Sequence, residues 1–416
     1  MQLSKQALMW QQQIQVQALQ TASDHLDCFL VALTSDKLSS RYFSVSGASV
    51  LYALRYKDLH EFQLEHPTKT IEWTGEKSIC VAGYMSEKNE ILELLLPLKL
   101  YAKGNKGLCP ERDFKVQHGG FSEEPVECLK HIFGKRCVVT SGHSNSEIQV
   151  WDIGDDDSDV IKRTGVINCS HTSAKGRKLA SGFTQNPSVL HGSTIHDVQQ
   201  TDISSGGKLY AVETDSLDIV SGLQFVTDNT FAICATNGTL YLGDSRNPKI
   251  NHYALSKSST GSHWTFGLRT VEAQCDTASC TVARLSSSGQ IIVSDLRNPS
   301  TPISQAQLSL QQNDLSDEFV TITWAPALDD LLAVSGFDGS VQIFDTKSWS
   351  TDSQTPRPVF VHRGHNLSWK EKADATLVVT THVWHPWRPR TLLSAASDGS
   401  IHVWDWVEQD NESTEK

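Results

Sequence analysis

Two pairs of histidines in this chain have a spacing that suggests metal binding. His362 and His365 form one pair and His382 and His385 form the other, each separated by two residues. Four imidazole rings could bind zinc. However, residues i and i+3 of a β-strand point to opposite faces, and the Trp-x-Pro segment that contains His385 recurs at 324–326 without a histidine. We therefore predict that the chain uses no metal ion and no other cofactor.

A short acidic run is a second candidate for chemistry. Asp155, Asp156 and Asp157 are followed closely by Asp159. Such a run could dock a basic surface of a partner protein, or it could be a solvated loop. Its spacing lacks the glycine bend and the distant bidentate glutamate that a calcium loop needs. A calcium site is therefore not predicted here.

The third candidate combines an aromatic side chain with two positive charges. Trp387, Arg388 and Arg390 follow one another across Pro389. Tryptophan and arginine are the residue types most enriched at the energetic centres of protein interfaces. The alternative is that Trp387 covers the edge of the surrounding sheet and that both arginines are solvated. The sequence leaves both interpretations open.

No common catalytic signature accompanies these candidates. The sequence contains no phosphate-binding loop, no serine nucleophile elbow and no dinucleotide fingerprint. Catalytic propellers need acid and base residues from several repeats at a shared channel, and the repeats described below show no recurring histidine or carboxylate of that kind. We predict that the protein is not an enzyme.

Composition restricts the partners and the compartment. Acidic residues outnumber basic ones in the 416-residue chain, 48 to 36, so its formal net charge is −12. A protein held on nucleic acid or on an anionic membrane needs a basic surface. Nine cysteines without a Cys-x-x-Cys pair are typical of reduced thiols, and no apolar run approaches the roughly 18 residues of a membrane span. We predict a cytoplasmic protein that binds neither nucleic acid directly nor a membrane.

The elements that must position these residues come from a repeated hairpin. Four segments consist of an apolar strand, a tight turn at Asp-Gly, Asn-Gly or Ser-Gly, and a strand that ends in Asp. They are 231–244, 282–295, 331–345 and 392–405. Two-residue turns favour Gly, Asn and Asp because these residues tolerate positive φ angles.

Counting the repeats predicts the architecture. Strand-ending aspartates recur at intervals of 42 to 60 residues, at Asp152, Asp202, Asp244, Asp295, Asp345 and Asp405. One more unit at 70–97 makes seven, and an earlier strand precedes each clear hairpin, with a fourth strand in the spacers. Seven four-stranded sheets cover one another when they are arranged around a channel. The sequence therefore predicts an all-β, seven-bladed β-propeller.

The last unit lacks an outer strand on its C-terminal side. The alternating segment Leu59–Leu64 lies upstream of the first unit, and we expect it to pair with Ile401–Trp404 and close the ring. This predicts a propeller over 50–406. The glutamine-rich residues 1–49 are expected to be a flexible extension or a short helix, and 407–416 a polar tail.

The units resemble the WD-repeat family, whose signature is a Trp-Asp ending, a Gly-His dipeptide and a turn aspartate. The matching positions are Trp151, Asp152, Asp338, Asp345, His365, Asp398, Trp404 and Asp405. In that family a histidine, a turn aspartate, a strand Ser or Thr and a strand tryptophan form a hydrogen-bonded series. The resemblance implies such a series of His365, Asp398, Ser394 and Trp404, with structural rather than catalytic roles.

Three further segments are similar to one particular branch of this family. They lie within 72–92, 105–122 and 380–406. That similarity implies a monomeric, non-enzymatic adaptor connected with microtubule organisation at spindle poles and the cleavage furrow. It also implies a connection with the RNA-cleaving module of the Integrator complex. The implied partners are cleavage-module subunits and microtubule-associated or tubulin-related proteins, and the implied location is the cytoplasm and spindle, with a nuclear pool.

Three function classes stay open on the residues alone. The first is a scaffold that contacts proteins through the loops between blades, including 101–125, 154–178 and 349–376. The second is a propeller hydrolase or lyase, which needs carboxylates or histidines converging at the channel mouth. The third recognises modified or acidic peptides and needs an aromatic cage or an arginine cluster at that mouth.

Overall fold

The computed structural model separates the chain into two compact units, 1–59 with 97–113 and 405–416, and 60–96 with 114–404. The residues that it describes are 56–84, 89–97, 113–142, 147–155, 158–169, 176–183, 186–255, 262–269, 280–310, 317–367 and 377–407. The N-terminal extension and most of the C-terminal tail lie outside these ranges. Nearly all of the description therefore concerns the second unit.

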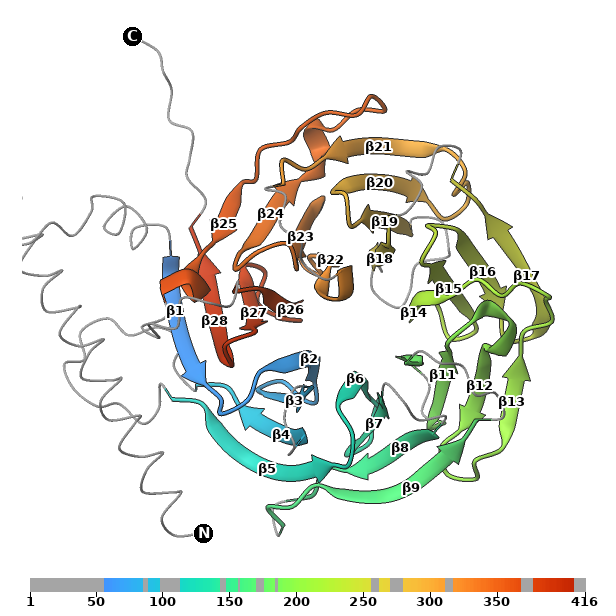
Figure 1. Ribbon diagram of the computed structural model, residues 1–416, viewed down its shortest axis with the longest axis vertical. Coiled ribbons are helices and arrows are strands. Elements are labelled where there is room, and N and C mark those ends of the chain that lie inside the picture. The colour runs from blue at the N-terminus through green and yellow to red at the C-terminus, as the bar shows by residue number, and fades with distance from the viewer. Residues whose placement is uncertain are drawn as a thin grey trace, which may run out of the picture. The chain divides into compact units, whose positions relative to one another are not determined.

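The described residues form a seven-bladed β-propeller, which confirms the predicted fold class (Figure 1). Blade 1 contains β2 (Thr68–Trp73), β3 (Ser78–Gly83), β4 (Asn89–Leu95) and β5 (Lys115–Ser122). Blade 2 contains β6 (Val126–His131), β7 (Cys137–Gly142), β8 (Glu147–Asp152) and β9 (Lys162–Asn168). Blade 3 contains β10 (Lys178–Ser181), β11 (Ser188–Gly192), β12 (Gln199–Asp202) and β13 (Lys208–Ala211).

The remaining blades repeat this pattern. Blade 4 contains β14 (Val220–Phe225), β15 (Thr230–Ala235), β16 (Leu240–Asp244) and β17 (Asn247–Tyr253). Blade 5 contains β18 (Trp264–Arg269), β19 (Thr281–Ser286), β20 (Gln290–Asp295) and β21 (Pro302–Gln307). Blade 6 contains β22 (Thr321–Trp324), β23 (Leu331–Ser335), β24 (Val341–Asp345) and β25 (Phe360–His362). Blade 7 contains β26 (Val379–Trp384), β27 (Thr391–Ala396), β28 (Ser400–Trp406) and β1 (Tyr56–Gln63).

In blades 1 to 6 the chain starts at the channel and moves outward strand by strand (Figure 1). The segments 115–122, 162–168 and 360–362 are therefore outer strands, which corrects the prediction that they belong to loops between blades. Short 3-10 helices interrupt the pattern. They are η2 (Ile195–Asp197), η4 (Asp317–Phe319), η5 (Thr346–Ser348) and η6 (Gly364–Leu367).

The closing strand is β1, which lies beside β28 and completes blade 7 as predicted. It begins at Tyr56, three residues before the expected start. Past its end, Leu64 N donates to Gly399 O at 2.9 Å. Gly399 has φ +88°, and a Cβ there would lie 2.8 Å from Leu64 O, so this turn requires glycine both for its conformation and for the close approach.

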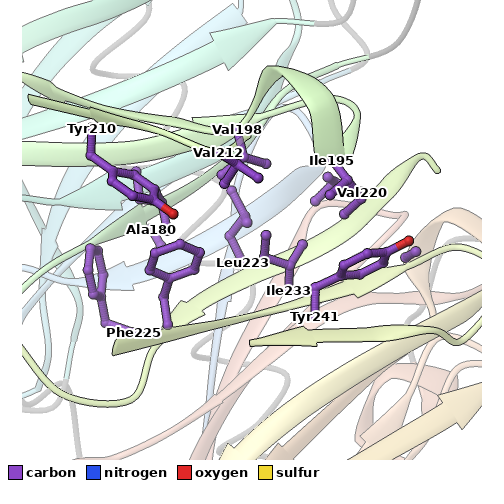
Figure 2. Packing of buried hydrophobic residues seen from close by; sticks show 13 residues of the cluster. Ala180, Ile195, Val198, Tyr210, Val212, Val220, Leu223, Phe225, Ile233 and Tyr241 are labelled. Carbon is purple, nitrogen blue, oxygen red and sulfur yellow. The ribbon is translucent and has the colours of Figure 1, made fainter. Parts of the chain in front are cut away.

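Apolar side chains between neighbouring blades form the core. Figure 2 shows one such cluster, in which Ala180, Tyr210 and Val212 of blade 3 face Leu223 and Phe225 of blade 4. The alternation of the strands places these side chains between two sheets, where each blade covers the apolar face of the next. Removal of this surface from water is the main stabilising contribution.

At the rim, blades are also joined in pairs by the backbone. Gly119 of β5 bridges in parallel to Val160 before β9, and Ala306 of β21 bridges to Gln354 between β24 and β25. A third parallel bridge joins Glu213 after β13 to Lys249 of β17. These bridges link blade 1 to blade 2, blade 3 to blade 4 and blade 5 to blade 6, and they cover outer edges that would otherwise be open.

In the part of the chain that the structure describes, no helix is long and apolar enough to cross a membrane.

Candidate functional site

The WD-type residues of blade 7 form one continuous hydrogen-bonded series. Trp404 Nε1 donates to Ser394 Oγ at 3.2 Å, and Ser394 Oγ lies 2.8 Å from His365 Nε2. His365 Nδ1 lies 2.7 Å from Ser400 Oγ, which donates to Asp398 Oδ1 at 2.7 Å. An indole can only donate and a carboxylate can only accept, so the protons run in one direction and His365 carries its proton on Nδ1. Ser400 stands between His365 and Asp398, which corrects the implied direct contact.

Aspartates of the other WD-type positions stabilise turns. Asp338 Oδ1 accepts from Ser340 N at 2.8 Å, and Asp345 Oδ1 accepts from Lys347 N at 2.9 Å at the start of η5. Asp152 accepts from Gly154 N at 3.0 Å. Each of these bonds satisfies a backbone N–H at a chain reversal, the usual role of aspartate in turns.

Within its described residues, blade 2 shows one part of the blade 7 series. Trp151 Nε1 donates to Thr140 Oγ1 at 2.8 Å, and both side chains are buried. The threonine takes the place that Ser394 has in blade 7. In both blades, the buried tryptophan therefore bonds to a hydroxyl on the adjacent strand of its own sheet.

Three buried histidines, His362, His365 and His402, meet between blades 6 and 7, and their nearest ring nitrogens lie within 4.8 Å of one another. The prediction that His362 and His365 face apart is wrong, because His365 lies in η6 rather than in the strand that contains His362. His402 was not recognised as their neighbour. It lies 40 residues away in sequence from His362, with 3.1 Å between His362 Nε2 and His402 Nδ1.

The arrangement of these rings does not suit a metal ion. The rings of His365 and His402 stack with centroids 3.8 Å apart at 10°, so their in-plane lone pairs cannot meet at one ion about 2.0–2.1 Å from each nitrogen. Both nitrogens of His365 are also engaged by serine hydroxyls. The second pair is separate, since His382 contacts Ser335 and Thr323 hydroxyls at 2.7 Å each.

The cluster instead joins two blades by ring stacking. His362 stacks on Trp404 with centroids 4.4 Å apart at 8°, and Phe360 stacks on the same indole at 5.5 Å. Burial lowers the pKa of His362, His365 and His402 well below the usual value, and the neighbouring imidazole lowers each further. The three rings are therefore neutral at pH 7 and pack as aromatic side chains.

A buried ionic network lies at the end of the channel where the inner strands start. Lys69 of β2 binds the carboxylates of Glu127 in β6 and Glu318 in η4. The Lys69 side chain is 6% exposed, and its ammonium lies 5.8 Å from the centroid of the Phe319 ring. Phe319 in turn packs edge-on against Tyr84 at 5.5 Å. Blade 6 thus reaches across the channel mouth to blades 1 and 2.

This network lies beside a polar cavity of about 160 Å³ that all seven blades line. The innermost lining residues are Lys69, Glu127, Lys178, Ser221, Thr265, Thr321 and Thr380. Three carboxylates, those of Glu127, Asp317 and Glu318, line the cavity together with His263, as the hydrolase or lyase hypothesis requires. Lys69 binds two of them, Glu127 and Glu318. No arginine occurs among the described lining residues, so the arginine cluster of the peptide-recognition hypothesis is not at this mouth.

The opposite end of the channel, where the inner strands finish, is organised by tryptophans. Trp73 Nε1 donates to Trp384 O at 2.9 Å, and Trp384 Nε1 donates to Thr323 O at 3.3 Å. Trp324 Nε1 donates to Gly267 O at 3.2 Å. Each indole thus bonds to the inner strand of the preceding blade. The signal in the sequence was that three inner strands end in Trp.

Trp387 lies at this end, in the turn between β26 and β27. Its side chain is 60% exposed, and its ring packs edge-on against His385 at 6.0 Å. His385 also contacts Trp73, with centroids 4.7 Å apart. Arg388 and Arg390 are half-buried, which differs from the alternative that both are fully solvated. Of the three predicted contact residues in this turn, Trp387 is therefore the most open to a partner.

Asp155, the first residue of the acidic run, follows β8 of blade 2 and is not part of the turn that carries Trp387. The Asp155 side chain is exposed, while its carbonyl O lies 3.0 Å from His118 Nε2. Asp156 and Asp157 lie outside the described residues. The first residue of the run is therefore held against blade 1 by His118.

His118 belongs to a buried carboxylate network that the sequence did not suggest. Glu93 is fully buried and accepts from Arg136 Nη1 and Nη2 at 2.7 and 2.8 Å. His118 Nδ1 lies 2.6 Å away, and Thr74 Oγ1 donates at 2.9 Å. Burial acts to raise the pKa of Glu93, but the bonds from Arg136, His118 and Thr74 hold it below the usual value. The network binds blade 1 to blade 2.

Comparison with known proteins gives four relatives that share one name. The chain is 59% identical to Integrator complex assembly factor WDR73 of Danio rerio, over 85% of this chain and 94% of the relative. It is 40% identical to Integrator complex assembly factor WDR73 of Homo sapiens, over 85% and 95%. A more distant likeness, 24% over 65% of this chain, is to the histone-binding protein MSI1 of Saccharomyces cerevisiae. No protein-family model matches the chain.

Proposed function

Because the chain belongs to the family of Integrator complex assembly factor WDR73, we propose that it is a non-catalytic scaffold that assists assembly of the Integrator complex. The observation that carries the proposal is identity of 40–59% over nearly the whole length of relatives with that name. A closed propeller suits the role, because its rigid body presents turns to other proteins at little cost in conformational entropy.

The chemistry of the channel mouth supports a role without catalysis. Glu127 and Glu318 share the single ammonium of Lys69, and the rings of the three-histidine cluster stack on one another. Neither set presents an acid and a base to a bound substrate. We propose that both sets stabilise the fold. An E127Q/E318Q variant should retain full assembly activity for each folded molecule.

We further propose that the partners are subunits of the RNA-cleaving module, a proposal that rests on the resemblance in sequence. The test is to mix the purified chain with recombinant cleavage-module subunits and analyse the mixture by size-exclusion chromatography. The expected result is a stable complex that contains the chain. The matched control is MSI1, which should not co-elute with these subunits. Failure of the wild-type chain to bind any subunit would contradict the proposal.

The same resemblance supports a second candidate, association with spindle microtubules from a cytoplasmic pool, with another pool in the nucleus. Imaging of a fluorescent fusion through mitosis, and sedimentation of the purified monomer with microtubules, test it separately. Enrichment at spindle poles without co-sedimentation indicates an indirect link. A fusion signal spread evenly through the mitotic cell, together with no co-sedimentation with microtubules, contradicts this candidate. The assembly role would then still stand.

A further inference from the structure

Three turns at the tryptophan end of the channel lie on neighbouring blades. We call residues 385–390 of blade 7, 74–77 of blade 1 and 132–136 of blade 2 the turn surface. Blades 7 and 1 are joined here by the contacts of Trp73 with His385 and with Trp384 O. Blades 1 and 2 are joined by the ion pair of Lys130 Nζ with Glu72 Oε2, at 2.8 Å. The inner strands β26, β2 and β6 are neighbours around the channel (Figure 1).

Exposed aromatic side chains stand on this surface. Trp387 is 60% exposed and Phe133 is 53% exposed, each at the tip of a turn. Gly134, beside Phe133, has φ +68° with open space around it, so the turn is shaped for exposure rather than for packing. Large aromatic side chains held on rigid turns are the residues that contribute most to protein interfaces.

The charge of the turn surface is opposite to that of the whole chain. Its basic residues are Arg388, Arg390, Lys77, Lys135 and Arg136, against the carboxylate Glu76, and Arg136 is bound to the buried Glu93. The protein as a whole carries a formal charge of −12. Among the described residues, neither Lys77 nor Lys135 forms an ion pair, and both side chains are exposed. A local basic area on an acidic protein selects an acidic partner through electrostatic complementarity.

We infer that the turn surface binds an acidic peptide segment of a partner protein that carries an aromatic or large aliphatic anchor. The anchor packs against Trp387 or Phe133, and the carboxylates of the segment pair with Lys77 and Lys135. This inference rests on the proposed assembly role and specifies the surface and the chemistry of the partner. A surface that combined the aromatic residues with no excess of positive charge would not choose between acidic and basic segments.

The first test measures binding of labelled peptides by fluorescence anisotropy at low salt. The probes are an acidic peptide with a central Phe (DEDFDED), the same peptide with Gly at the centre, and a basic peptide with Phe (KRKFKRK). The expected order is strongest binding by the acidic Phe peptide, with the other two at least tenfold weaker. No binding of the acidic Phe peptide, or equal binding of the basic one, overturns the inference.

Two matched variants locate the site. The test variant is W387S/K77E/K135E. The control is L217S/K208E/K249E, which changes an apolar residue that is 74% exposed and two exposed lysines on blades 3 and 4. Both variants add the same negative charge. The test variant should lose at least tenfold in affinity for the acidic Phe peptide, and the control should lose less than twofold. Equal losses in both variants would mean a general charge effect and contradict the inference.

The same variants separate this inference from the proposed function. If the wild-type chain fails to co-elute with the partner subunits, the proposed function fails. If the wild type and the test variant co-elute equally well, the function stands and the turn surface is excluded. Loss of co-elution by the folded test variant alone, with retention by the control, supports both. Thermal unfolding and circular dichroism confirm that each variant is folded.

Discussion

The two ends of the propeller channel differ in how they use charge. At the end where the inner strands start, Lys69 is buried and bound to carboxylates from two other blades. At the end where they finish, Lys77 and Lys135 are exposed, and so are the aromatic side chains of Trp387 and Phe133. A lysine whose charge is satisfied internally stabilises the fold, whereas one that is open is available to a partner. The two ends should therefore respond differently to substitution, one in stability and the other in binding.

Acid pH should lower the free energy of unfolding more than any of the substitutions below. It acts on the histidine cluster between blades 6 and 7, which belongs to neither end of the channel. His362, His365 and His402 have folded-state pKa values well below the unfolded value of about 6.5, so the unfolded chain takes up protons first. Their contribution is fully present above pH 6.5 and is lost as pH falls below it, by about 1.4 kcal/mol for each histidine per pH unit.

Urea denaturation at pH 7.5 and pH 5.5 measures this loss. The variant H402Q should show a shallower dependence on pH than the wild type, because one buried imidazole is gone. Since the turn surface contains no member of the cluster, binding for each folded molecule should not follow the loss of stability. A free energy of unfolding that is constant over this range would contradict the neutral stacked cluster.

The substitution K69M, at the channel end where the inner strands start, should lower the free energy of unfolding by about 3 kcal/mol. Removing one partner of a buried ionic network leaves charge unpaired, which typically costs about 3–5 kcal/mol, and the partial exposure of Glu318 reduces that cost. Chemical denaturation provides the measurement. The folded fraction of K69M should still bind the acidic Phe peptide with wild-type affinity. Loss of peptide binding would place the ligand at the wrong end of the channel.

The substitution W384F should cost about 1 kcal/mol in stability. It removes the indole donor to Thr323 O in the preceding blade, and the net contribution of one hydrogen bond has about that size. The matched control is W387F, since Trp387 is exposed. The melting temperature of W387F should equal that of the wild type. Equal destabilisation by both substitutions would mean that ring size, and not the bond between blades, matters at this end.

The triple variant of the turn surface should have the smallest effect on stability, within about 0.5 kcal/mol, because all three side chains are exposed. It should nevertheless have the largest effect on peptide binding among the variants considered. Unfolding and anisotropy measured on the same samples give both quantities. A large loss of stability would show that these turns are structural and would remove the contrast between the two ends.

The fold could be predicted because its signals are local. Hairpin turns, alternating strands and strand-ending aspartates each lie within about 15 residues, and repetition makes them visible. Even the closing strand was recognisable, since Leu59–Leu64 alternates and blade 7 lacked an outer strand. The exact series in blade 7 was not, because Ser400 looked like an ordinary turn residue until its hydroxyl was placed between Asp398 and His365.

The site was harder to predict because its contacts join distant parts of the chain. Lys69 and Glu318 are 249 residues apart, and Glu93 meets Arg136 across the boundary between two blades. No periodicity within one repeat indicates which polar residues of different blades will meet. The exposure of Trp387 also depends on its neighbours, whereas the buried Trp384 three residues earlier has the same side chain.

In blade 5, a different pair of side chains occupies two positions of the WD repeat. At the position of Trp404, directly before the strand-ending aspartate, it has Ser294. Arg284 of the adjacent strand is buried, and its Nη2 donates to Ser294 Oγ at 3.4 Å and to Pro299 O at 3.2 Å. A long side chain on one strand thus replaces a large ring on the other. Blade 5 keeps the packing of the WD repeat without its signature.

The shared blade 7 has a consequence for the order in which the chain is synthesised. Gln63 at the end of β1 donates to Asp398 O, a partner 335 residues later. Ribosomes add about 5–20 residues per second, so β1 waits roughly 20–70 s with an unpaired edge while the other blades form. During that interval β1 is free to pair with the wrong strand, and a chaperone or slow translation that protects it would raise the yield of native protein. The last step in forming the propeller is then the capture of β1, the first of its described strands to be made.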